Sequence, residues 1–252
     1  MAKPANGTPL KRTGIAYYLT EAFLLAEASG ATITGSKAGI TGTLAGAYSW
    51  VDTDYGKAVQ TASGTGYGQL TDAAALRFTG AFSLFWAGIF AGVGGSSSGL
   101  VSKLGGAAAR ACGLQWDQNG RWYQWMASNA TTLSSQNSDI YSYNAVDVIV
   151  AVWEPSTRLT IYANGAKLKE TTTGIYSAFF NANGLGWALM SRGDLAAKTN
   201  GKTLAFGFFG KALSDAEVAQ QLSTIDQVYR LWGPSRRAGL GGGMASLSGG
   251  FA

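Results

Sequence analysis

Arg158-Leu-Thr-Ile-Tyr-Ala-Asn-Gly-Ala-Lys-Leu168 is the first of two stretches that decide the fold of this chain. It predicts a strand, a tight turn and a second strand, because Asn164-Gly165 favours the positive backbone angles of a two-residue type I′ turn. This turn would place Tyr162 opposite Lys167 on the outer face of the hairpin, and Ile161 opposite Leu168 on the inner face.

The second stretch, Gly210-Lys-Ala-Leu-Ser-Asp-Ala-Glu-Val218, predicts the start of a helix. Ser214 can cap this helix, and Glu217, three residues later, can reach back to the N–H of the cap. Four apolar residues then recur at helical spacing and would form one buried stripe: Val218, Leu222, Ile225 and Tyr229. A hairpin, a last strand and a short capped helix are an uncommon ending for a β-rich chain.

The composition agrees with a β-sandwich. The 252 residues include 36 glycines and only 13% charged residues, against about 25% charged residues in an average soluble domain. Strand patterns recur at short spacing, with neither an internal repeat nor a convincing domain boundary, so we expect a single all-β antiparallel sandwich. Two of the strands are marked by apolar residues that alternate onto one face: Phe82, Leu84 and Trp86 in one, and Val148, Val150 and Val152 in the other.

A second Asn-Gly pair, Asn119-Gly120, predicts another two-residue hairpin turn within residues 111–128. In that register, four residues would share the core face: Leu114, Trp116, Tyr123 and Trp125. Four others would share the opposite, largely solvated face: Gln115, Asp117, Trp122 and Gln124. An exposed ring beside amides is typical of a glycan site, so this second set is a candidate glycan or partner face. The alternative is that a loop, a second layer or, as we prefer, a neighbouring subunit covers Trp122.

The residue types argue against an enzyme. The chain has no histidine and one cysteine, which excludes the usual Ser-His-Asp and Cys-His arrangements. Cys112 is expected to be a small buried residue. A retaining glycosidase needs two carboxylates about 5 Å apart, and the acids closest in sequence are Asp52 with Asp54 and Asp215 with Glu217. Helix capping already explains the second pair, so we expect no catalytic residues.

The scarcity of metal-ligating residues also argues against a bound metal cofactor. One cysteine and no histidine make a zinc site unexpected. Calcium prefers several oxygen ligands, and Asp52, Asp54 and backbone carbonyls could contribute some. These groups are too few to predict a calcium site, and we expect no cofactor.

Basic residues are concentrated at the two ends of the chain. Of nineteen bases, six lie in terminal segments that carry no acid: Lys3, Lys11 and Arg12, then Arg230, Arg236 and Arg237. The remaining thirteen nearly balance the fourteen acids. A nucleic-acid binder would more often carry a basic stripe on its folded body, so we interpret the ends, together with Trp232, as docking arms for an acidic partner surface. The alternative is that they are solvated tails.

No membrane segment is expected, because the sequence contains no apolar run of 18 residues. Residues 1–31 share early bases and an apolar stretch with signal peptides, but Glu21 interrupts that stretch. We therefore interpret these residues as mature sequence and predict no signal peptide.

Six short segments, in this order and spacing, carry a resemblance to a known family: Glu27-Ala-Ser-Gly30, Gly56-Lys-Ala-Val59, Phe82-Ser-Leu-Phe-Trp86, Leu100-Val-Ser-Lys103, Leu159-Thr-Ile-Tyr-Ala-Asn-Gly165 and Ala212-Leu-Ser-Asp-Ala-Glu-Val218. Together they resemble the laminin-G-like, concanavalin-A-like jelly-roll family, from about Ile15 to Leu231. The chain departs from that pattern at Val146-Asp147, where the family often has a tryptophan. The resemblance implies a jelly-roll domain over residues 14–231, a basic arm over 1–13 and a Gly-rich basic tail over 232–252.

The resemblance also implies a class of function. Laminin-G-like proteins are mostly modules that bind glycans or proteins, and stand-alone versions occur among bacteriophage virion proteins. Some virion versions end in a tail similar to Leu231-Trp-Gly-Pro-Ser-Arg-Arg237. We therefore expect a non-enzymatic virion subunit, such as a capsid decoration protein, with other virion proteins and sister copies as partners. The alternative is a lectin-like module, secreted or on a virion, that binds glycans.

Overall fold

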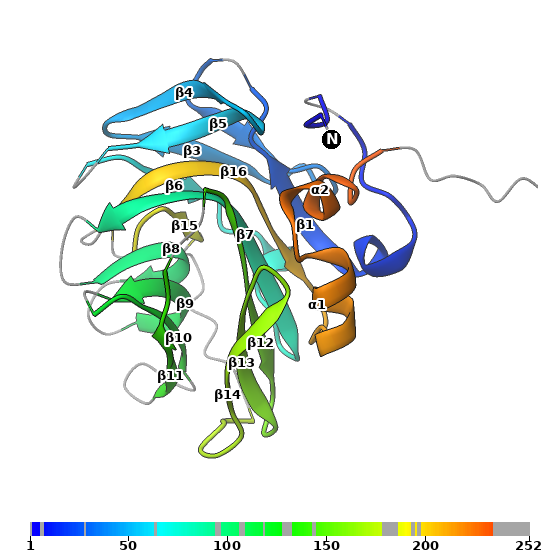
Figure 1. Ribbon diagram of the computed structural model, residues 1–252, viewed down its shortest axis with the longest axis vertical. Coiled ribbons are helices and arrows are strands. Elements are labelled where there is room, and N and C mark those ends of the chain that lie inside the picture. Colours follow the sequence, from blue (N-terminus) through cyan, green and yellow to red (C-terminus); the bar gives the residue numbers. More distant parts are fainter. Residues whose placement is uncertain are drawn as a thin grey trace, which may run out of the picture.

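The computed structural model describes residues 2–5, 8–27, 29–62, 65–93, 97–105, 109–117, 119–127, 133–142, 145–177, 186–192, 195 and 198–233. Within this part of the chain, two antiparallel sheets of eight strands each face one another (Figure 1). The predicted all-β antiparallel sandwich is thereby confirmed. No helix within these residues is long and apolar enough to cross a membrane.

The first sheet has the order β14-β13-β12-β7-β16-β5-β4, and β1 also pairs with β16. Its strands are β1 (Leu19–Leu24), β4 (Tyr48–Thr53), β5 (Gly56–Thr61), β7 (Phe82–Val93), β12 (Asp147–Glu154), β13 (Arg158–Ala163), β14 (Ala166–Thr171) and β16 (Thr199–Phe209).

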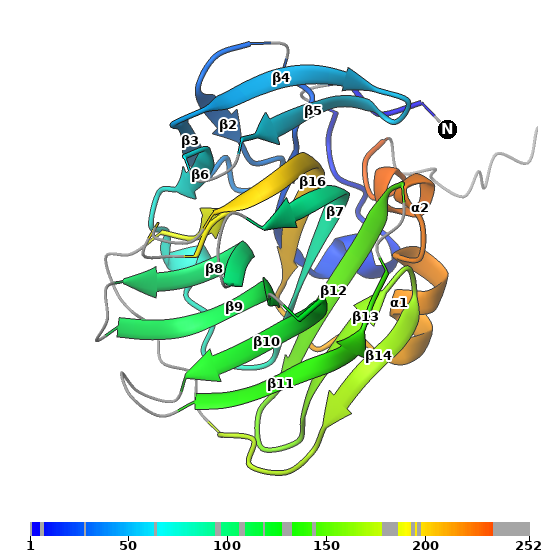
Figure 2. The same ribbon diagram turned by 60° about the vertical axis from the view of Figure 1, so that its left-hand side comes forward.

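The second sheet has the order β11-β10-β9-β8-β15-β6-β3-β2. Its strands are β2 (Thr32–Thr34), β3 (Thr41–Ala45), β6 (Tyr67–Leu70), β8 (Ser97–Gly105), β9 (Ala109–Asp117), β10 (Arg121–Ala127), β11 (Leu133–Ile140) and β15 (Ala188–Leu189). Figure 2 shows β8–β11 lying across from β12–β14.

The central strands of the first sheet are buried on both faces. Its inner face meets the second sheet in the main core, to which β7 contributes Phe82, Leu84 and Trp86 as predicted. Its outer face is covered by α1 (Asp215–Gln221) and α2 (Ile225–Tyr229), which lie on the side away from β8–β11 in Figure 1. The predicted stripe Val148, Val150 and Val152 is buried between this outer face and the helices, in a second hydrophobic cluster. Burial on two faces explains why β7 and β12 are almost continuously apolar.

The β13–β14 hairpin largely follows its prediction. Asn164 and Gly165 have φ values of 49° and 81°, as a type I′ turn requires, and Tyr162 pairs with Lys167. The predicted pairing of Ile161 with Leu168 is wrong, because a bulge shifts the register and Ile161 pairs with Lys169. Tyr162 lies on the outer face as predicted, and it is buried there in the cluster that the sheet forms with the helices.

The capping box at Ser214 is confirmed. The Glu217 N–H donates to Ser214 Oγ at 3.3 Å, and the Ser214 N–H donates to Glu217 Oε2 at 2.9 Å. The predicted single helix is divided into α1 and α2, since the Thr224 side chain caps a new helix by accepting from the Gln227 N–H. All four residues of the predicted stripe are nevertheless buried: Val218, Leu222, Ile225 and Tyr229.

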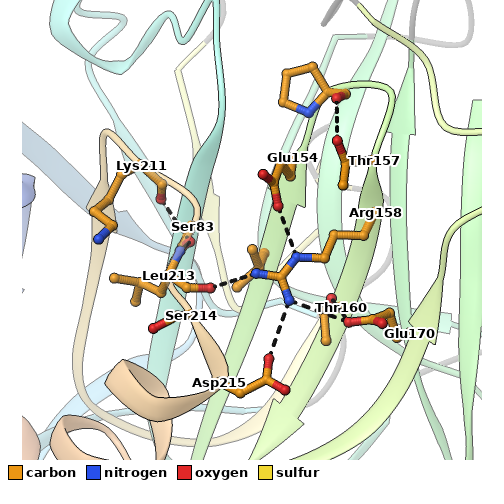
Figure 3. Close-up of polar contacts among 12 residues, drawn as sticks. Ser83, Glu154, Thr157, Arg158, Thr160, Glu170, Lys211, Leu213, Ser214 and Asp215 are labelled. Carbon is orange, nitrogen blue, oxygen red and sulfur yellow. Dashed lines mark hydrogen bonds and ion pairs between the residues drawn. The ribbon is translucent and has the colours of Figure 1, made fainter.

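An ion-pair network joins the hairpin to α1 (Figure 3). The Arg158 guanidinium contacts Glu154 Oε2 at 3.0 Å and Asp215 Oδ1 at 3.3 Å, and donates to the Leu213 carbonyl at 3.1 Å. The two stretches that decide the fold from sequence are therefore in direct contact.

Two residues assigned to docking arms pack on the sandwich itself. Leu10 forms an isolated β-bridge with Trp232, and the Trp232 side chain is only 3% exposed, with its indole N–H donating to Ser36 Oγ at 2.9 Å. Lys3 places its ammonium among backbone carbonyls of the body. The prediction that Lys3 and Trp232 contact a partner is therefore wrong.

Candidate functional site

The glycan face predicted on the β9–β10 hairpin is wrong, because the register is shifted by one residue. Trp122 pairs with Trp116, and Gln124 with Leu114, whereas the prediction paired residue 116 with 123. A shift of one residue moves every side chain of a strand to the other face. Trp122 therefore lies between the sheets, with its ring 4.6 Å from that of Trp116 and 5.6 Å from that of Phe90.

The other three residues of that predicted face are buried or hold the turn together. The Gln124 side-chain amide is buried and donates to the Val152 carbonyl at 3.0 Å, and Gln115 is 4% exposed. Asp117 Oδ1 accepts the N–H groups of Asn119 at 2.8 Å and Arg121 at 3.0 Å, which closes the turn. These residues pack and shape the hairpin instead of forming an exposed binding face.

Three of the predicted basic residues meet at one place instead. Lys11 and Arg230, which come from opposite ends of the chain, line the same hollow of about 230 Å³ between the N-terminal segment and the two helices. Arg12 lines an adjoining hollow of about 470 Å³. Arg236 and Arg237 lie outside the described residues.

The two hollows share Thr13, Gly14 and Gln221, so they form one depression, which we call the tyrosine groove. It runs along the short helix η1 (Gly14–Tyr18). Gly14 has a φ of +62°, and a Cβ there would lie 2.8 Å from Gln221 Oε1, so glycine allows η1 to approach α1 closely. Gln221 Oε1 also accepts the Ile15 N–H at 3.2 Å, which fixes one wall.

Tyr17 and Tyr18 line the wider hollow. They are 65% and 46% exposed. Among the described residues, they are the large hydrophobic residues that are exposed to solvent. Their rings meet edge to face with centroids 5.3 Å apart, and the Lys211 ammonium lies 4.5 Å from the centre of the Tyr18 ring. An ordered pair of exposed rings offers a ligand an apolar surface whose edge is polar.

The polar lining is rich in amides and bases. Gln220, Gln221 and Gln227 line the narrower hollow with Lys11 and Arg230. The acid on the wall of the wider hollow, Glu217, is engaged by the Lys211 ammonium at 2.7 Å and by the helix cap. Rings, amides and charged donors together suit a ligand that has many hydroxyl or anionic oxygens.

Sequence reasoning found the bases of this groove but missed Tyr17 and Tyr18. Their signal was two adjacent aromatic residues in a short segment directly after Lys11-Arg12. Two adjacent aromatic residues indicate a binding surface here only because the structure places their segment against residues 220–231.

The groups considered for catalysis or metal binding have other contacts. Asp215 accepts from the Tyr162 hydroxyl at 2.6 Å and pairs with Lys167 at 2.7 Å. Burial raises the pKa of the Cys112 thiol well above its usual value. Asp52 pairs with Lys57 at 2.8 Å, and across the described ranges no group of three His, Cys, Asp or Glu residues could hold a metal ion.

Comparison with known proteins finds the fold but not a family. Neither a family model nor a curated protein matches the sequence. Among solved structures, the binding domain of botulinum neurotoxin DC in complex with SialylT is similar, with a TM-score of 0.63 and 12% identity over 84% of this chain and 52% of that one. The binding domain of Paraclostridial Mosquitocidal Protein 1 has a TM-score of 0.62 and 12% identity, over 81% of this chain and 52% of that one.

A sialidase of Trypanosoma rangeli, in complex with the inhibitor DANA, is also similar, with a TM-score of 0.60 and 12% identity over 81% of this chain and 33% of that chain. The chain thus spans about half the length of the toxin domains and a third of the sialidase. The ligands of those proteins need not bind in the part that is shared. At this identity the comparisons show a common fold, a β-sandwich like that of toxin binding domains.

Proposed function

We propose that this chain is a non-enzymatic glycan-binding module and that its ligand binds in the tyrosine groove. The observation that carries the proposal is the exposed pair Tyr17 and Tyr18, set beside three glutamines and three bases in one depression. Sugar rings stack their apolar faces on aromatic side chains, while their hydroxyls need amide and charged partners.

The comparisons support a glycan as the class of ligand. One similar structure is a toxin binding domain in complex with SialylT, and another is of botulinum neurotoxin type C, whose cell entry is dependent upon interaction with two ganglioside molecules. The second has a TM-score of 0.61 and 13% identity over 85% of this chain and 53% of that one. A shared fold does not by itself imply a shared ligand. The proposal therefore rests on the residues of the groove, and the comparisons suggest which glycans to test first.

The virion hypothesis has less support. Lys3 and Trp232, two residues of its docking arms, contact the body of the same chain, and the named similar structures are toxin domains and a sialidase. A virion location and sister-copy contacts stay predictions, as does the laminin-G-like resemblance. A protein on a virion and a secreted protein could both bind a surface glycan.

A glycan array tests the proposal. The wild type is expected to bind a defined set of glycans, and Tyr17→Ala and Tyr18→Ala are each expected to weaken that binding about 2- to 13-fold, because a stacking ring contributes on the order of 0.5–1.5 kcal/mol.

Tyr67→Ala is the matched control, because the Lys198 ammonium lies 5.5 Å from the Tyr67 ring, as Lys211 lies over Tyr18, yet Tyr67 is outside the groove. It should bind like the wild type. Equal loss in all three variants would point to altered folding, and an array without any bound glycan would refute the module's function.

A further inference from the structure

The start of the N-terminal segment is anchored to the sandwich by the Lys3 ammonium. Lys3 Nζ donates to three backbone carbonyls: Leu25 at 2.7 Å, Leu204 at 2.9 Å, and Lys57. These carbonyls come from the residue after β1, from β16 and from β5. A primary ammonium has three N–H donors, so each donor has one acceptor.

A carboxylate and a ring complete the surroundings. Glu27 attracts Lys3 electrostatically, and burial raises the pKa of the Glu27 carboxyl. Its Oε2 is buried and has no hydrogen-bond partner among the residues described. The ammonium also lies 5.9 Å from the centre of the Tyr229 ring. We call the three carbonyls and Glu27 the ammonium socket.

The backbone is shaped to admit this lysine. Gly56 has a φ of +100°, and a Cβ at that position would lie 2.7 Å from the Cβ of Lys3. A side chain at residue 56 would therefore collide with the N-terminal segment as it crosses β5. The segment lies against a hollow of about 490 Å³ that is separate from the tyrosine groove and that also contacts Asp52 and Asp54.

The three directed carbonyls are what favours an ammonium in the socket, whereas burial opposes its charge. Burial lowers the pKa of Lys3 to about 7, and the Glu27 carboxylate acts in the opposite direction. A charge taken from water into such a place is stabilised only if its donors are all satisfied. Three directed carbonyls do this for –NH₃⁺, whereas a quaternary ammonium of the same charge offers no N–H to them.

We propose that the ammonium socket is a binding site for primary ammonium groups, which the chain fills with its own Lys3 and which an external alkylammonium fills when that side chain is absent. The ligand class follows from the three carbonyls, which match three N–H donors, and the Glu27 carboxylate adds electrostatic attraction for a cation. The inference is independent of the glycan-binding proposal.

Chemical rescue of the full-length Lys3→Ala variant tests it. The melting temperature of Lys3→Ala is measured in n-butylammonium chloride and in tetramethylammonium chloride at equal ionic strength. We expect n-butylammonium to raise the Tm by about 2–4 °C relative to tetramethylammonium, the shift that one polar interaction gives in a chain of this length. The wild type, whose socket is filled, should show no such difference.

Two further variants make the result specific. Lys3→Met, which keeps an apolar stem, guards against a folding defect in Lys3→Ala and should be rescued less, since its stem occupies the path to the socket. Adding Glu27→Gln to Lys3→Ala should reduce the rescue. The proposal is overturned if both salts act alike on Lys3→Ala, or if potassium chloride, which supplies a cation without N–H donors, matches n-butylammonium.

Discussion

Asp215 is the residue where the hairpin and the helix are most strongly coupled by charge. It accepts from Lys167 and Tyr162 and contacts Arg158. The hydrogen bond from Lys167, followed by that from Tyr162, lowers the pKa of Asp215 to about 2. Burial, together with the neighbouring carboxylate, raises the pKa of Tyr162 to about 12. A residue at the start of a helix is thus fixed by two strands as well as by the helix dipole.

This coupling predicts how stability depends on acid. The folded-state pKa of Asp215 is depressed from 3.8, so its contribution is complete above about pH 4 and is lost as the pH falls toward 2. The Asp215 side chain is 57% exposed, and solvent screening limits the contribution to about 0.5–1 kcal/mol. Urea unfolding of wild type and Asp215→Asn should differ by that amount at pH 6, and the difference should shrink between pH 4 and pH 2.

Asp226→Asn is the matched control, because Asp226 is the acid in the first turn of α2. A helix-dipole effect alone would give the two variants the same pH dependence. A difference between wild type and Asp215→Asn that stays constant down to pH 2 would contradict the assignment.

At the scale of elements, the N-cap of α1 has a measurable role. Ser214 and Glu217 satisfy each other's backbone N–H groups, and loss of such a cap typically costs about 1 kcal/mol. Ser214→Ala is therefore expected to lower the free energy of unfolding by about 1 kcal/mol in urea titrations. Ser214→Asp, which keeps an acceptor at the cap, should recover most of that loss; equal losses in the two variants would exclude the cap as the cause.

The two Asn-Gly hairpins show how far sequence reasoning reaches at this scale. At Asn164-Gly165 both residues have positive φ, and the type I′ prediction is confirmed. At Asn119-Gly120 only Gly120 does, with a φ of 78°. There Asp117 accepts the N–H groups of Asn119 and Arg121, which favours a wider turn and moves the register by one residue. The dipeptide predicted both turns, but the residue two positions before it decided which face Trp122 occupies.

At the level of the whole molecule, the groove forms because segments near the two ends of the chain pack against each other. The charge pattern predicted that Lys11, Arg12 and Arg230 lie in two arms that dock on a partner, not that they meet on the same molecule. Their meeting depends on contacts between residues over 200 positions apart, such as the Lys11 N–H donating to the Leu231 carbonyl at 2.8 Å. Periodicity and local turn chemistry contain no information on such a contact, so the bases were assigned to a partner.

Trp232 is the main hydrophobic anchor of this contact between the chain ends, and its removal makes the last prediction. The side chain is buried in the cluster beneath the helices, and its backbone bridges Leu10. Trp232→Ala is expected to lower the free energy of unfolding by about 3–5 kcal/mol, and to weaken glycan binding because Lys11 loses its fixed place beside Arg230. Trp232→Phe, which keeps an aromatic ring but loses the indole N–H bonded to Ser36, should cost about 1 kcal/mol for that hydrogen bond and leave binding intact. Urea titration gives the first quantity and the glycan array the second. If Trp232→Ala binds glycan as the wild type does while fully folded, the groove does not depend on the joined ends.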